Sequence, residues 1–405
     1  MQGNQNMPVS SYRWVVLAIM WLTMFISVLA QFQVAALSFE IIPALNLTPG
    51  NFVMLLSASM LPAVLFALVA GSLADKFGVK KVVAVSFIFS IIGTCFRYIP
   101  DSFFGYFILM FLAGMTPAFL NANAPKLLGA WFPREKIGTA LGIYFSAIGV
   151  GTTVGLATTA LFPTAKTAYI TAAIIMLIIG ILWLVLVKNK PEGALEPPAM
   201  PALEYIGVAI KSRNIWLAGL ALMCFMGANI AFVGFLPDAL GQVHGISPAQ
   251  AGIMSSVVPI GIILGNIIGP IMSARIGRIK PFLVPVAFIG AIVMYLSWIT
   301  PGIGIWPMLF AAGFFLGISA PLLLSFPMLL PEIGPTYAGS AGGILATLQL
   351  AGGFFIPAFI IAPIAGHNFT LLFALASLTL VIMGVISWFL PELGVKAKDR
   401  SQVNL

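Results

Sequence analysis

The segment Gly71–Lys81, with the sequence GSLADKFGVKK, separates two long apolar runs near the start of this 405-residue chain. Its pattern predicts a tight reversal between two helices. Gly71 can allow two helices to approach closely, and Gly78 can adopt the backbone conformation that a short turn requires. Asp75 falls at a helix end, where a carboxylate can face a basic side chain or the positive N-terminus of another helix.

The composition of the whole chain is that of a membrane protein. Hydrophobic residues make up 60% of it and charged residues only 7%, with a mean hydropathy of +1.09. An ordinary soluble domain carries about 25% charged residues. A spanning helix needs roughly 20 consecutive apolar residues, and runs of this length recur along the whole sequence. A soluble protein is therefore excluded, and no room is left for a sizeable soluble domain.

Apolar runs bounded by charged and turn residues predict an all-α protein with twelve transmembrane helices in two six-helix bundles. The first six runs are 14–37, 50–74, 81–99, 103–127, 137–161 and 167–188. The second six are 214–238, 249–273, 281–299, 304–330, 338–363 and 369–390. The predicted domains are thus an N-terminal bundle over 1–188, a Pro- and Glu-containing cytoplasmic linker over 189–213, and a C-terminal bundle over 214–405.

The basic residues predict the orientation in the membrane. If both termini are cytoplasmic, only Arg97 and Lys166 fall on the outer side, and the other seventeen of the 19 Lys and Arg residues are cytoplasmic. This asymmetry is what the positive-inside rule expects for an even number of spans. The pI near 9.6 is therefore interpreted as a topology signal in a cell (inner) membrane, with the lipid bilayer and not nucleic acid as partner.

The two halves of the chain are related by a nearly constant offset, as in carriers built from parallel repeats. Three places match in residue type and in position relative to the predicted helices. They are Trp14 with Trp216, Gly138 with Gly339, and Gly78 with Gly277, at offsets of 202, 201 and 199 residues.

The segment 71–81 resembles the loop signature of the major facilitator superfamily, in which Gly, an acid four residues later, a base, a second Gly and further bases follow the second helix. This resemblance covers the whole chain and implies a carrier that works by alternating access, with this loop clamping the halves together in the outward-facing state. The second-half copy has Ala274 where the acid stood, so the expected clamp is asymmetric. Small residues over 339–342 would suit its docking surface. The predicted gating residues are Gly71, Asp75, Lys76, Gly78, Lys80, Arg275, Gly277 and Arg278.

The segments 131–138 and 330–335 are similar to loops of the branch that includes cyanate permease-like, nitrate or nitrite, and organic-anion carriers. Nitrate carriers of that branch hold their anion with one arginine on helix 2 and another on helix 8. The predicted helices here contain neither, because 50–70 and 249–273 hold no Arg or Lys. Nitrate is therefore not the expected substrate.

Polar residues inside the predicted spans are the candidates for substrate binding, because they are costly in a membrane. Arg97 is either an interface anchor or a charge that attracts an anion into an outward-facing vestibule. Two amides beside Pro125 either join helices or line the central cavity. The full set of candidates is Gln31, Gln33, Arg97, Asn121, Asn123, Lys126, Tyr144, Asn229, Asn266 and Gln349.

No Asp or Glu falls in the middle of a predicted span; Glu40, Asp101 and Asp238 lie at or near outer ends. A proton-driven exporter of drug cations normally needs a buried carboxylate, so a neutral or anionic solute fits better. The sequence predicts no enzyme, metal site or cofactor. It predicts a monomeric secondary transporter of a small anion, such as a monocarboxylate or a cyanate-like molecule, by proton symport or exchange. The alternatives are a multidrug exporter and a membrane sensor that binds without transport.

Overall fold

The computed structural model describes residues 11–191, 208–300 and 302–393, and within these ranges it is helical with no strand. Within α-helices, the side chains of residues 68, 75, 134, 135, 138 and 334–339 lie outside the description. Twelve helical segments are long and apolar enough to cross a membrane. The predicted fold class and the twelve predicted spans are confirmed, with ends that differ by a few residues.

The first six spans follow the first half of the chain, several of them in two pieces. They are α1 (Arg13–Ala36); α3 (Pro49–Ser57) with η1 (Ala58–Met60) and α4 (Leu61–Phe77); α5 (Val79–Cys95) with η2 (Phe96–Tyr98); α6 (Phe103–Ala113) with α7 (Met115–Trp131); α8 (Arg134–Thr159); and α9 (Ala165–Leu186). A short helix that the sequence did not predict, α2 (Ser38–Ala44), follows α1.

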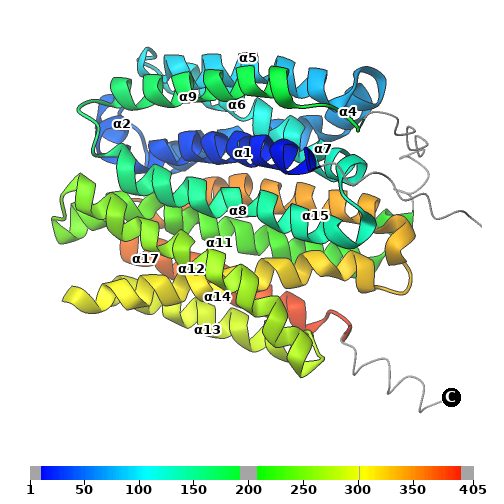
Figure 1. The fold of residues 1–405 in the computed structure, drawn as a ribbon. Helices are drawn as coiled ribbons and strands as arrows, with labels where there is room; N and C mark the ends of the chain where they lie inside the picture. Colours follow the sequence, from blue (N-terminus) through cyan, green and yellow to red (C-terminus); the bar gives the residue numbers. More distant parts are fainter. Residues whose placement is uncertain (1–10, 192–207, 301, 394–405) are drawn as a thin grey trace, which may run out of the picture. The chain divides into compact units, whose positions relative to one another are not determined.

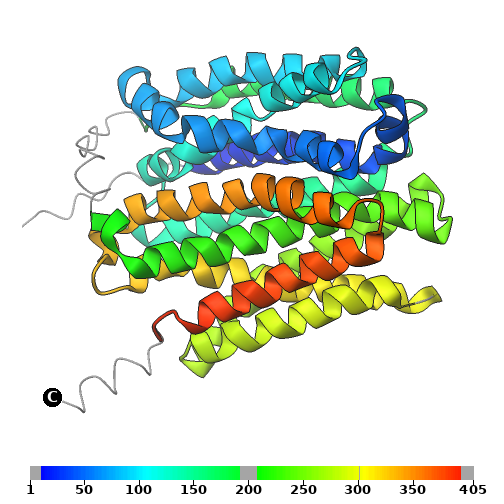
Figure 2. The same ribbon diagram turned by 180° about the vertical axis from the view of Figure 1, so that it is seen from behind.

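The second six spans follow in the same order. They are α11 (Arg213–His244); α12 (Pro248–Ile276); α13 (Lys280–Ile299); η3 (Gly302–Gly304) with α14 (Ile305–Leu329); α15 (Gly334–Ile356) with the π-helix η4 (Pro357–Ile361) and α16 (Ala362–Ala365); and α17 (Phe369–Trp388). Helices α11 and α15 lie side by side in both ribbon views (Figure 1, Figure 2).

The second and fourth spans are each interrupted, and the two interruptions meet. The fourth span breaks at Gly114, between α6 and α7, and the second changes to a tighter helix at η1. A Cβ on Gly114 would overlap the backbone of Ser59 in η1. Glycine at this position therefore lets the two broken helices approach backbone to backbone.

The chain divides into two compact units. The first contains residues 1–33, 58–155 and 162–200, and the second contains 34–57, 156–161 and 201–405. In the second unit the end of α1, with α2 and α3, packs against helices of the second half of the chain: the Phe52 and Phe235 rings are 5.7 Å apart. Most of the predicted linker, 192–207, lies outside the described residues, so the linker and the bundle boundaries stay predictions.

Glycines hold helices close together within each unit. In the first unit, a Cβ on Gly151 or Gly155 would lie 2.7 Å or 2.9 Å from a carbonyl oxygen of α1. Gly151 and Gly155 therefore allow α8 to pack closely against α1.

Candidate functional site

The loop between α4 and α5 has the predicted reversal. Gly78 is the one residue between the two helices, and its φ of 84° lies in the region that favours glycine. A Cβ there would lie 2.5 Å from the Asn189 side-chain nitrogen. Asn189 Oδ1 accepts a hydrogen bond of 2.8 Å from the backbone N–H of Lys80. The sequence indicated the glycine but not this contact, which joins the loop to the segment after α9.

The predicted role of Gly71 stays a prediction. A Cβ on Gly71 would meet no atom within 4 Å among the described residues. The side chain of Asp75 lies outside the described residues, although its backbone is part of α4. Lys76 is exposed and Lys80 is half-buried.

The second half also has a glycine with positive φ after its second span, but in a three-residue connection, 277–279, between α12 and α13. Gly277 has a φ of 72° and caps α12. The backbone N–H of Ile279, just before α13, donates to Glu392 Oε1 at 2.8 Å. Asn189 lies shortly after the end of α9, and Glu392 lies shortly after the end of α17. Each half therefore ties the start of its third span to the segment that follows its sixth. Arg275 is exposed and Arg278 is half-buried.

The predicted docking surface for Asp75 is only partly described. The side chain of Gly339 lies outside the described residues, whereas Ala341 is buried. A Cβ on Gly342 would meet nothing within 4 Å among the described atoms. The clamp between the two loops therefore stays a prediction.

The segment 330–335, which follows α14, forms hydrogen bonds with residues at the start of α11. Glu332 accepts hydrogen bonds from Asn214 Nδ2 at 2.8 Å and from Ser212 Oγ at 3.1 Å. Partial burial raises the pKa of Glu332, but these hydrogen bonds outweigh it, so the net pKa lies below the usual value. The segment at 131–138 makes a comparable contact in the first half, because the Phe132 ring lies 5.4 Å from the ring of Trp14.

Arg97 is buried inside the first unit. It is 1% exposed, its Nη1 donates to the Ala30 carbonyl oxygen at 2.7 Å, and its Nη2 donates to Gln33 Oε1 at 3.2 Å. Its guanidinium carbon lies 4.4 Å from the centre of the Tyr169 ring. The interface-anchor interpretation is therefore wrong, because an anchor would reach the surface. The sequence missed these partners, which come from α1 and α9.

Gln33 and Asn123 are buried and donate hydrogen bonds to backbone carbonyl groups of the first unit. Gln33 is 2% exposed and also donates to the Ala168 carbonyl oxygen at 3.0 Å. Asn123 is 1% exposed and donates to the carbonyl oxygens of Ala70 and Phe119. For Asn123 the structure favours helix-to-helix bonding, one of the two roles that the sequence left open.

Asn121 and Tyr144 form a polar pair between α7 and α8. The Tyr144 hydroxyl donates to Asn121 Oδ1 at 2.6 Å, and Asn121 is half-buried. Its NH₂ group is therefore left to donate to another acceptor. Gln31 is half-buried with interactions of its own, and Lys126 is exposed with at least one further contact.

The candidates in the second unit do not converge on one point. Asn229 and Gln349 are half-buried and form no hydrogen bond within the described part of the chain, and Asn266 is exposed. A Cβ on Gly352 would overlap the backbone of Met223, so these two residues lie at the same height along α15 and α11. With both helices running in the same direction, Gln349 and Asn229 are separated by about 14 Å along the axis.

One acidic residue is more deeply buried than its position suggested. Asp238, within α11, is 6% exposed, and its two oxygens accept from Gln242 Nε2 at 2.9 and 3.0 Å. Among the residues described, no group of three or more His, Cys, Asp and Glu is placed to hold a metal ion.

Comparison with known proteins gives one family. The model described as Major Facilitator Superfamily matches residues 19–357. A Cupriavidus necator protein named "Probable sulfoacetate transporter" is 23% identical, over 83% of each chain. A hexuronate transporter of Bacillus subtilis is 21% identical, over 88% of this chain and 90% of its own. A nitrite extrusion protein of Bacillus subtilis is 24% identical, over 80% of each chain.

The fold also matches a solved structure. A bacterial homologue of the human lysosomal transporter Spinster superposes with a TM-score of 0.74 at 15% identity, over 94% of this chain and 97% of its own. At this identity the likeness concerns the fold alone.

Proposed function

Because this chain belongs to the major facilitator superfamily, we propose that it is a secondary transporter that moves a small organic anion by alternating access. The two six-helix bundles, 1–188 and 214–405, rock about a central path, and the segment 71–81, which contains Asp75, stabilises one of the two states. The chain lies in the cell (inner) membrane as a monomer, with both termini cytoplasmic. A proton or a second anion accompanies the substrate.

One observation carries the substrate class: relatives that align over four-fifths or more of the chain are named for sulfoacetate, hexuronate and nitrite. Two of these three are organic acids whose charge is carried by carboxylate or sulfonate oxygens. Such oxygens accept hydrogen bonds and donate none. A site for them therefore needs donors.

The free amide groups support this proposal. The pairing with Tyr144 occupies the oxygen of Asn121 and leaves its NH₂ group to donate. Asn229 and Gln349 each bring a half-buried amide with no hydrogen-bond partner among the described residues. Because about 14 Å separates them along the helix axis, a small anion contacts one of them at a time. Lys126 supplies a positive charge on α7. Both terminal nitrogens of Arg97 already donate hydrogen bonds inside the first unit. Arg97 therefore supports anion binding through its positive electrostatic potential and not through direct contact.

Uptake into proteoliposomes tests the proposal. The purified chain is reconstituted and offered labelled sulfoacetate, glucuronate, nitrite and a lipophilic drug cation. We expect saturable uptake of at least one organic anion, with competition by unlabelled anions, and no uptake of the drug cation. Extrusion of the drug cation without any anion flux contradicts the proposal and favours the alternative function, a multidrug exporter.

A pair of variants tests the polar residues. Tyr144→Phe removes the donor to Asn121 and frees the amide to rotate, so we expect KM for the anion to rise by about tenfold or more. Glu40→Gln changes an exposed residue on α2 and serves as the control, with an unchanged KM expected. Equal KM values for both variants would remove Asn121 and Tyr144 from the proposed path.

A further inference from the structure

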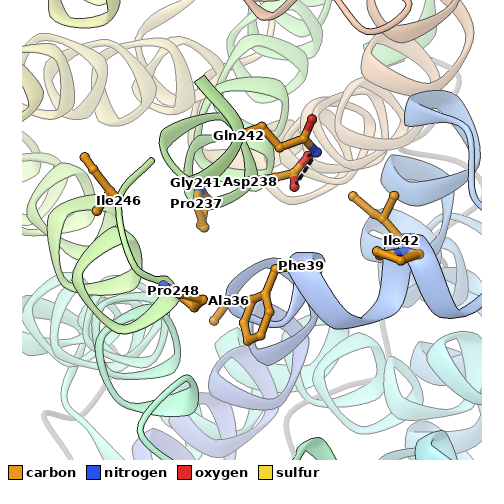
Figure 3. A pocket seen from close by; sticks show the side chains of 10 residues that line it. Ala36, Phe39, Ile42, Pro237, Asp238, Gly241, Gln242, Ile246 and Pro248 are labelled. Carbon is orange, nitrogen blue, oxygen red and sulfur yellow. Dashed lines mark hydrogen bonds between the residues drawn. The ribbon is translucent and has the colours of Figure 1, made fainter. Parts of the chain in front are cut away.

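A cavity of about 340 Å³ lies at the corner of four helices, and all of its lining residues belong to the second unit. One wall comes from the end of α1 and from α2, and the other comes from the end of α11 and the start of α12 (Figure 3). Small-molecule sites are mostly apolar and have volumes of about 300–1,000 Å³. The cavity is therefore large enough for a small ligand.

The walls are apolar apart from one carboxylate and one amide. Phe39, Ile42 and Ile246 contribute hydrophobic surface, and Asp238 and Gln242 bring the polar atoms. In Figure 3 the Asp238–Gln242 pair faces across the gap toward the α2 side chains. Apolar walls around a single acid match the chemistry of an amphipathic cation.

The carboxylate of Asp238 has unused capacity for a cation. An ionised carboxylate offers about four lone-pair positions, and both oxygens here accept from the same Gln242 nitrogen. The imidazole of His367, on the loop before α17, is close enough to interact electrostatically. A carboxylate that is 6% exposed is costly unless positive charge or further donors compensate it.

We propose that this cavity binds a small organic ammonium ion that carries an apolar group. The ammonium donates to Asp238 and to the side-chain oxygen of Gln242, and the apolar group packs against Ile42 and Ile246. The ring of Phe39 adds an aromatic surface, which attracts cations when they lie over its face.

Binding of the ammonium ion in this cavity also affects transport, an effect that rests on the proposed transport function. The wall at residues 36–43 belongs to the first half of the sequence, and the wall at 237–248 belongs to the second. A ligand that contacts both walls stabilises the arrangement in which they touch. The ammonium ligand therefore inhibits a carrier that must separate these segments during its cycle.

Calorimetric titration of the purified full-length protein with benzylammonium tests the site. Benzoate and benzyl alcohol serve as the anionic and neutral probes of similar size. We expect saturable binding of benzylammonium alone, weakened about tenfold or more in Asp238→Asn and by less than about twofold in Glu40→Gln. The matched control removes an exposed acid one residue from Phe39. Equal binding to the wild type and Asp238→Asn, or no binding to the wild type, overturns the proposal.

A second pair of variants leaves Asp238 in place, in case its replacement prevents folding. Ile246→Trp fills the cavity and is expected to abolish binding, and Phe39→Ala is expected to weaken it. Retention of full affinity by both variants overturns the proposal. Transport is then measured in proteoliposomes with benzylammonium present. If benzylammonium binds but does not inhibit transport, only the inhibition through bridging of the two walls is contradicted. If the wild type shows no anion flux at all, only the proposed transport function is contradicted.

Discussion

Helices α12 and α14 touch along a seam of glycines where no side chain fits. A Cβ on Gly265 would overlap the carbonyl oxygen of Phe314 and lie 3.0 Å from Cα of Gly317. A Cβ on Gly317 would in turn overlap the carbonyl oxygen of Ile262. The four-residue spacing places the glycines on one face of each helix, as in small-residue packing motifs of membrane helices. The seam consists of Gly261, Gly265 and Gly269 on α12, and Gly313 and Gly317 on α14.

Replacing Gly265 by alanine should force the two helices apart. Ordinary contact begins at 3.4 Å, so the backbones must separate by about 1 Å to relieve the overlap. Inserting a methyl group into a packed interior costs about 1–3 kcal/mol. Alanine regains about 0.5–1 kcal/mol in a helix relative to glycine. The expected net loss is about 1–2 kcal/mol, which lowers the apparent Tm of a chain of 405 residues by about 1–2 °C.

Thermal unfolding of the detergent-purified protein measures this loss. Gly129→Ala is the matched control, because a Cβ there would meet only Ile137 Cδ1, at 3.9 Å, among the described residues. The control should keep or raise the Tm, because the helix gains alanine without a clash. Equal stability of Gly265→Ala and Gly129→Ala would refute the close packing of α12 against α14 at these glycines.

Three further predictions concern side-chain contacts. Asn189→Ala removes the acceptor for the Lys80 N–H and should cost about 1 kcal/mol, read from the Tm; an unchanged Tm would show that water replaces the contact. Arg97→Met should cost about 1–3 kcal/mol for each buried acceptor left unpaired, Gln33 Oε1 among them, and a normal Tm would contradict the burial. Because the pKa of Glu332 is lowered in the folded protein, its stabilising effect is present above the usual Glu pKa of about 4.3 and is lost as pH falls through the lowered value. The Tm difference between wild type and Glu332→Gln should therefore shrink over that range, and a constant difference would disprove the effect.

The fold could be predicted from the sequence because its strongest signals are local. A spanning helix requires only a sufficient apolar length, and one-sided charge fixes the number of spans. Gly78 and Gly277 were found for the same reason, since a turn directly after a helix that takes a positive φ favours glycine at that point. The break at Gly114 was missed, because its cause is the backbone of Ser59, which is distant in the sequence.

The candidate site depends on contacts that a sequence pattern does not carry. Arg97 lies near the end of its helix and so has the pattern of an anchor, but its partners Ala30 and Gln33 are more than 60 residues away. Asp238 was placed at a helix end by its position in the apolar run, whereas the cavity beside it exists only because residues 36–43 fold against α11. Burial of a charge is a property of the tertiary structure, and helix periodicity gives no information on it.

Exchange across the membrane tests the central claim, that this chain is an alternating-access carrier of a small organic anion, most directly. Proteoliposomes are preloaded with a high concentration of the unlabelled anion and then diluted into a trace of the labelled one. We expect transient accumulation of label above its equilibrium level, because the substrate site of an exchanging carrier is loaded whichever side of the membrane it returns from. Label that enters at the same rate with or without internal anion, or does not enter at all, would contradict it.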